Sequence, residues 1–121
     1  MDLHKRTKSE ADKLLNEWVK RLHLEDWRIK LNINCTDEDT EGNLGLTAWQ
    51  EVNRTARINM LDEDLYERSR IVPYDWEKTL VHELLHLKTC LLTDVDDSLQ
   101  ERVGHMLIDD LARALVDAKR S

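Results

Sequence analysis

The stretch Leu80–Leu87 constrains the chain most, because it contains His-Glu-x-x-His within an apolar segment. In a helix, residues four apart lie one turn apart on the same face. His82 and His86 can therefore offer ring nitrogens to one metal ion, while Glu83 lies to the side, where it can reach a water on that ion. Two imidazoles, an open coordination position and a carboxylate base are what zinc-dependent hydrolysis requires. The stretch predicts a Zn²⁺ site with Glu83 as general base.

The leucines around this motif help to decide whether the two histidines bind a metal ion or only lie at the edge of a core. A helix as apolar as this one buries much of its surface, and a buried neutral imidazole needs a hydrogen-bond partner. A shared metal ion satisfies both rings together. The alternative is a pair of helix histidines at the edge of a core, with no ion between them. We favour the metal site.

Size and charge limit the classes of protein that the chain can belong to. With 121 residues, one domain spanning 1–121 is expected. The net charge of -7 argues against a nucleic-acid partner, because phosphate binding needs clustered cations. No apolar leader follows Met1, no run reaches the length of a membrane span, and Cys35 and Cys90 lack metal-site spacing. We expect a protein of the cytoplasm, without a membrane partner.

Periodicity predicts the order helix, three strands, helix, helix. Apolar residues at helical spacing indicate the helices, and strict alternation indicates the strands. The expected helices span 7–23, 74–92 and 97–119, and the expected strands are Trp27–Asn34, Leu44–Val52 and Thr55–Met60. Leu99, Val103, Leu107, Leu111, Ala114 and Leu115 form the expected apolar stripe of the last helix. The pattern predicts an α+β domain with a small, three-stranded, mostly antiparallel sheet.

A catalytic zinc ion usually has three protein ligands, so a third is expected after the motif. If the last two helices form an antiparallel hairpin, Glu101 and His105 both lie at the height of His82 and His86. Helical phase places Glu101 at the border of the apolar face and His105 further toward solvent. We therefore favour Glu101 as the third ligand over His105. His105 could instead support a ligand or donate a hydrogen bond to the reaction oxyanion.

Beyond the motif, the order of elements carries a family resemblance. Two expected strands precede Thr79–His86, one with the pattern Trp27-x-Ile29-x-Leu31 and one ending Ala56-Arg57-Ile58-Asn59. An expected helix that begins near Gln100-Glu101 follows. Over about 8–119 the chain resembles the small zincin-type metallopeptidases of phages and bacteria and is similar to minimal gluzincins. It more distantly resembles the SprT-like and ImmA/IrrE-type zincins.

The resemblance implies a zincin fold in which the edge strand of the sheet lines a cleft above the motif helix. It implies His82, His86 and Glu101 as zinc ligands and Glu83 as the general base. Gluzincins often carry an aspartate four residues after the ligand glutamate, and here that position is His105. Tyr74 and His105 are the candidates for the group that steadies the tetrahedral intermediate. A phage origin would place the protein in the host cytoplasm.

These observations lead us to expect a zinc metallopeptidase with Glu83 and His105 in catalytic roles. A peptide or protein substrate would lie extended along Thr55–Met60, taken as the edge strand. One alternative is a catalytically weak or inactive binding or regulatory module that is stabilised by the same zinc site. Another is a metal-free structural protein, whose melting temperature a chelator would leave unchanged.

Overall fold

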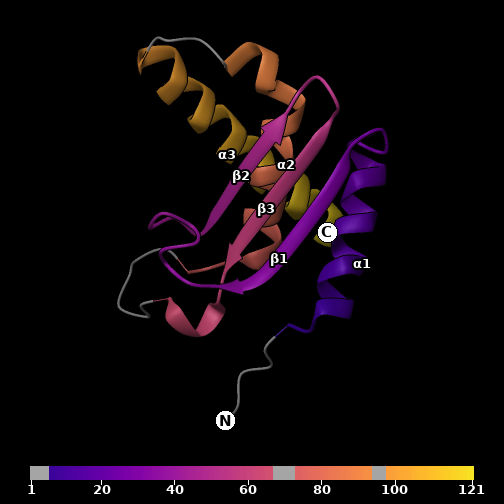
Figure 1. Ribbon diagram of the computed structural model, residues 1–121, viewed down its shortest axis with the longest axis vertical. Coiled ribbons are helices and arrows are strands. Elements are labelled where there is room, and N and C mark those ends of the chain that lie inside the picture. Colours follow the sequence, from indigo (N-terminus) through magenta and orange to yellow (C-terminus); the bar gives the residue numbers. More distant parts are fainter. Residues whose placement is uncertain (1–5, 67–72, 94–97) are drawn as a thin grey trace.

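The computed structural model describes residues 6–66, 73–93 and 98–121, with side chains placed except at 91–93 and 98–101. Local sequence signals mark the ends of the elements. Thr7, for example, caps the first helix, because its hydroxyl accepts a hydrogen bond from the Glu10 amide while the Glu10 carboxylate accepts one from the Thr7 amide. The elements in chain order are α1 (Lys8–Arg21), β1 (Arg28–Cys35), β2 (Gly45–Gln50), β3 (Thr55–Leu61), the 3-10 turn η1 (Glu63–Leu65), α2 (Trp76–Thr93) and α3 (Ser98–Arg120) (Figure 1).

The three strands form a mixed sheet in the order β1-β3-β2. β3 pairs antiparallel with β2 and parallel with β1. The expected α+β class with a small three-stranded sheet is therefore confirmed. The prediction that this sheet is mostly antiparallel is wrong, because one of its two strand pairs is parallel. The reason is topological: the chain reverses between β1 and β2 and again in the β2–β3 hairpin, so β3, which pairs with β1, runs in the same direction as β1.

The strand order also corrects the expected substrate edge. Thr55–Met60 belongs to β3, which is the central strand and already pairs on both sides. A peptide therefore cannot add to it by strand pairing. Within the described residues, the strand with an unpaired edge on the motif side is β2, which neighbours α2.

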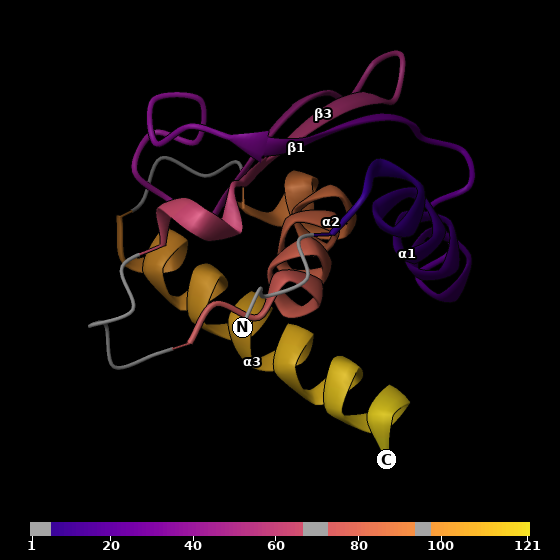
Figure 2. The same cartoon turned by 90° about the horizontal axis from the view of Figure 1, so that it is seen from below.

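In the part of the chain that the structure describes, all three α-helices lie on one face of the sheet, as Figure 2 shows, and none of them covers the other face. The core fills the space between, and its side chains come from the inward positions of the strands and from every helix. Its largest fully buried members are Trp18, Leu24, Ile58, Met60, Leu80 and Leu84. α2 runs between the sheet and α3, which explains its apolar sequence.

The rotation of α3 differs from the expectation. The structure buries Ile108, Ala112 and Val116 against the core. Val103, Leu107 and Leu111 belong to the expected stripe, yet their exposed fractions are 47%, 57% and 49%. The helix carries two apolar rows about 100° apart, and packing against α2 selects the row that continues from His105.

A buried ion network holds the three helices together. Glu77 of α2 is 7% exposed and accepts a hydrogen bond from the Trp18 indole at 2.7 Å. Its carboxylate also pairs with Lys119 and, at 3.2 Å, with Arg120 near the end of α3. Burial would raise the pKa of Glu77, but the hydrogen bonds from Lys119 and Trp18 outweigh burial and hold the pKa below its usual value. Among the described helices, none is long and apolar enough to cross a membrane.

Candidate metal centre

Three histidines converge where α2 and α3 cross. His82 and His86 come from successive turns of α2, and His105 comes from α3. One ring nitrogen from each lies within 4.8 Å of the others, which is close enough for the three to bind one metal ion. The ring of His105 lies 5.0 Å from that of His86 and 6.2 Å from that of His82, centroid to centroid.

His105 therefore occupies the place that sequence reasoning preferred for Glu101. Helical phase, taken alone, turned His105 toward solvent, but the observed rotation of α3 turns it toward the two motif histidines. The side chain of Glu101 lies outside the described residues. Its role as a ligand stays a prediction. The described residues offer His105 as the third nitrogen ligand.

Asp109 supports His82 from one turn further along α3. Its Oδ1 lies 3.6 Å from Nδ1 of His82, which leaves Nε2 free to bind an ion. A carboxylate behind a ligand histidine fixes the tautomer and orientation of the ring. Burial lowers the pKa of His82, the charge of Asp109 raises it and that of His105 lowers it, with a net lowering. Sequence reasoning counted Asp109 among the candidate ligands after the motif but assigned it no role, although it stands four residues after His105.

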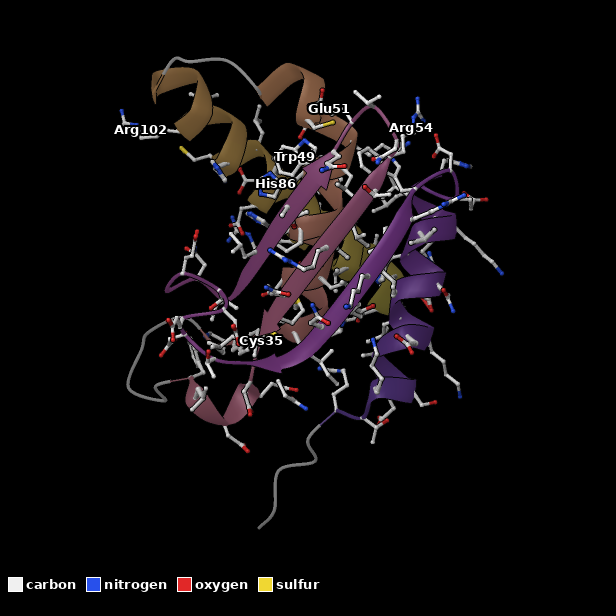
Figure 3. All side chains as sticks on the ribbon, in the orientation of Figure 1. Cys35, Trp49, Glu51, Arg54, His86 and Arg102 are labelled. Atoms are coloured by element: carbon white, nitrogen blue, oxygen red, sulfur yellow. The ribbon has the colours of Figure 1, made fainter. Side chains whose placement is uncertain are left out.

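His86 is held by stacking. Its ring lies nearly parallel to the indole of Trp49, at 13° and 6.3 Å between centroids, and Figure 3 shows the two side chains together where β2 ends. Burial, together with His82 and His105, lowers the pKa of His86 to about 4. His86 is therefore neutral at neutral pH, which is the form that binds metal.

Glu83 is buried beneath β2 and is 5% exposed. The Thr47 hydroxyl donates a hydrogen bond to its carboxylate at 2.7 Å. Burial raises the pKa of Glu83 to about 7, although this hydrogen bond acts in the opposite direction. Gly45 leaves room for the side chain, because a Cβ at that position would lie 2.9 Å from Cγ of Glu83. Neither Thr47 nor Gly45 stood out in the sequence.

A cleft of about 710 Å³ opens between β2, α2 and α3. The three histidines, Glu83 and Trp49 line it near the metal centre. The lining continues past Thr79 and Lys78 to Asp75, toward the first turn of α2. A chain lying along the edge of β2 would pass both the histidines and the Glu83 carboxylate.

Tyr74, the other candidate for steadying an intermediate, lies apart from this arrangement. Its hydroxyl donates a hydrogen bond to the Leu61 carbonyl at 2.9 Å, and the side chain is not part of the cleft lining. Burial raises the pKa of Tyr74 well above its usual value. The Tyr74 hydroxyl is therefore hydrogen-bonded to the backbone of β3 and does not face the cleft.

Comparisons with protein-family models, with curated proteins and with solved structures find no match to this chain. The geometry of the site is therefore the basis on which function is inferred.

Proposed function

We propose that the chain is a zinc-dependent peptidase of zincin type, with His82, His86 and His105 as metal ligands and Glu83 as general base. One observation carries the proposal. Three histidine nitrogens lie within 4.8 Å of one another, and the three histidines line a cleft together with Glu83. Catalytic zinc sites typically have three protein ligands and a fourth position for water or substrate, whereas structural zinc sites have four protein ligands.

The donor set fits zinc. Imidazole nitrogen is a preferred zinc ligand, and the lowered pKa of His86 and of His82 keeps both rings in the neutral, metal-binding form. Asp109 supplies the carboxylate that commonly stands behind a zinc-ligating histidine. A bound zinc ion supplies Lewis acidity, which lowers the pKa of water and polarises a carbonyl oxygen.

Within this proposal, the residues of the chain transfer the proton, orient the base and bind the substrate. Glu83 accepts a proton from the attacking water and later donates it to the leaving amine, a task that suits a carboxyl group whose pKa is near 7. Thr47 holds the carboxylate in place. The substrate lies extended beside β2 and pairs with the free edge of that strand.

The decisive experiment compares the zinc-loaded wild type with Glu83→Gln on a fluorescence-quenched peptide library. Glutamine keeps the size of the side chain and the contact with Thr47, so zinc content should stay the same while cleavage is lost. Zinc is counted by elemental analysis of the same samples. Cleavage at the wild-type rate by Glu83→Gln would refute the proposal.

A second candidate is a zinc-stabilised binding or regulatory module. It is favoured by the position of Tyr74, whose hydroxyl is bonded to Leu61 and cannot steady an intermediate in the cleft. The same library separates the two candidates. A wild type that is fully loaded with zinc and cleaves none of the peptides supports the binding module.

A further inference from the structure

The face of the sheet turned away from the helices carries a concentration of positive charge. Side chains alternate along each strand, and the helices cover only one face of the sheet. The outward positions of the two paired parallel strands hold Arg28, Lys30 and Asn32 on β1 and Thr55, Arg57 and Asn59 on β3. None of the six is acidic. In a chain with a net charge of -7, this distribution is uneven.

Two of these cations stand side by side. Lys30 and Arg57 are direct register partners on adjacent strands, whose spacing is about 4.8 Å. Arg28 lies two residues before Lys30 on the same face. Like charges at paired positions destabilise a sheet. All three side chains are exposed, and none forms an ion pair within the described part of the chain. By contrast, Arg54 in the nearby turn pairs with Asp26.

The opposite end of the same face is bounded by negative charge. The amide of Asn59 donates a hydrogen bond to the backbone carbonyl of Asp39 at 3.1 Å, which ties the loop after β1 to this end of the sheet. Asp37, Glu38 and Glu41 of that loop are exposed as well. The positive patch is therefore short, and it ends at an acidic loop.

We propose that the patch formed by Arg28, Lys30 and Arg57 is a docking surface for a short acidic segment of a partner protein. Charge complementarity selects an anionic partner. A segment of a few residues fits within the patch, and its carboxylates would neutralise the adjacent Lys30 and Arg57 charges. Beside Arg57, β2 presents Ala48, and beside Asn59 it presents Leu46. These small apolar surfaces suit contact with a polypeptide.

The same observations disfavour a nucleic acid on this face. A polynucleotide needs a longer path of cations and, when single-stranded, aromatic rings on which bases can stack. The outward positions named above hold no aromatic ring. A phosphate chain that extended along the sheet toward Asn59 would approach the exposed acidic residues of the loop after β1.

The test uses fluorescence anisotropy of a labelled oligoglutamate peptide at low ionic strength, with oligoglutamine and oligothymidylate as comparison probes. The test variant is Lys30→Gln with Arg57→Gln. Its matched control is Lys13→Gln with Lys20→Gln, which removes the same charge from exposed positions on α1. The full-length protein is used throughout, and circular dichroism checks the fold of each variant.

We expect oligoglutamate to bind the wild type in a salt-sensitive manner and the sheet variant about tenfold more weakly, while the α1 variant stays within about twofold of the wild type. Amide shifts in NMR spectra should concentrate on β1 and β3. Three results would overturn the proposal: no binding of oligoglutamate, equal losses in the two variants, or oligothymidylate binding more tightly than oligoglutamate at the same amides.

Discussion

Gly45 lies so close to Glu83 that a Cβ atom at position 45 would displace the Glu83 side chain. A Cβ at position 45 would lie 2.9 Å from Cγ and 3.1 Å from Cδ of Glu83. Two residues along β2, the Thr47 hydroxyl donates a hydrogen bond to the same carboxylate at 2.7 Å. One strand thus makes room for the proposed base and also orients it. β2 has a direct part in the candidate site.

Gly45→Ala should therefore damage activity without removing the metal. The added methyl group meets Glu83 and Cγ2 of Thr79, at 3.1 Å from the latter. A displacement of about 1 Å at a catalytic group can reduce the rate about a hundredfold. We expect that order of loss in cleavage of the best library peptide, with unchanged zinc content. Ala48→Gly, which changes an outward position of β2, is the control. Full activity in Gly45→Ala would contradict the proposed place of Glu83.

The elements themselves were largely predictable because local patterns encode them. Alternation along Trp27–Asn34 anticipates β1, which the structure places at Arg28–Cys35, and the expected motif helix over 74–92 matches α2 at Trp76–Thr93. The order of the strands depends on contacts between distant segments. The alternation of apolar and polar residues in Thr55–Met60 is the same for an edge strand and for a central strand of a sheet, so the position of β3 could not be deduced from it.

The third ligand illustrates the same limit in a helix. α3 has apolar residues in two neighbouring rows, one through Leu107 and Leu111 and one through Ile108 and Ala112. The larger side chains favoured the first row, but packing on α2 buries the second. A shift of one residue in this choice rotates the helix by about 100°, which is enough to bring His105 beside His82 and His86, although its side chain stays exposed.

Metal content should distinguish His105 from Glu101. His105 is one of the three clustered histidines, so His105→Ala should lower zinc affinity strongly, while Glu101→Ala should leave about one zinc ion per chain. Elemental analysis after dialysis against a weak chelator measures both. Loss of zinc in Glu101→Ala with retention in His105→Ala would instead make Glu101 the ligand. Wild type without zinc after loading would remove the metal site altogether.

Trp49 should report metal binding. Its indole stacks on His86 at 13°, so an ion that fixes the His86 ring changes the surroundings of the indole. We expect zinc to alter tryptophan fluorescence in the wild type, and this change to be largely lost in Trp49→Phe. Trp27→Phe removes a tryptophan that lies before β1, and it should keep the response. An unchanged response in Trp49→Phe would place the source of the signal elsewhere.

The stability of the metal-free protein should depend on pH through Glu83. Its pKa rises from the usual 4.5 to about 7 on folding. A raised pKa means that the contribution to stability is fully present below pH 4.5 and is lost as the pH rises through 7. Glu83→Gln, which stays neutral, should therefore be more stable than the wild type by about 3 kcal/mol at pH 8, with little difference at pH 4.

Urea unfolding in the presence of a chelator measures this difference at each pH. The pKa of His86 shifts in the opposite direction, to about 4, so its stabilising contribution is lost as the pH falls. Because His86 is present in both proteins, its contribution largely cancels in the comparison. A gap between the two proteins that is constant from pH 4 to pH 8 would contradict the proposed burial of a titrating Glu83.

Glu77 should be the most important single anchor between the helices. Its side chain is 8% exposed, and its carboxylate pairs with Lys119 and Arg120 of α3 and accepts a hydrogen bond from the Trp18 indole N–H. Glu77→Gln keeps an acceptor for Trp18 but removes the charge that balances the two cations. We expect a loss of about 2 kcal/mol in the free energy of unfolding at neutral pH.

This loss should itself depend on pH, in the direction set by the lowered pKa of Glu77. A lowered pKa gives stability that is present above the usual value and is lost as the pH falls through the folded-state pKa, so the gap between wild type and Glu77→Gln should narrow in acid. Glu17→Gln is the matched control, because Glu17 also pairs with Lys119, at 2.9 Å, but its side chain is 38% exposed. Exposed pairs contribute at most about 1 kcal/mol. Equal losses in the two variants at neutral pH would mean that burial adds nothing to the Glu77 network.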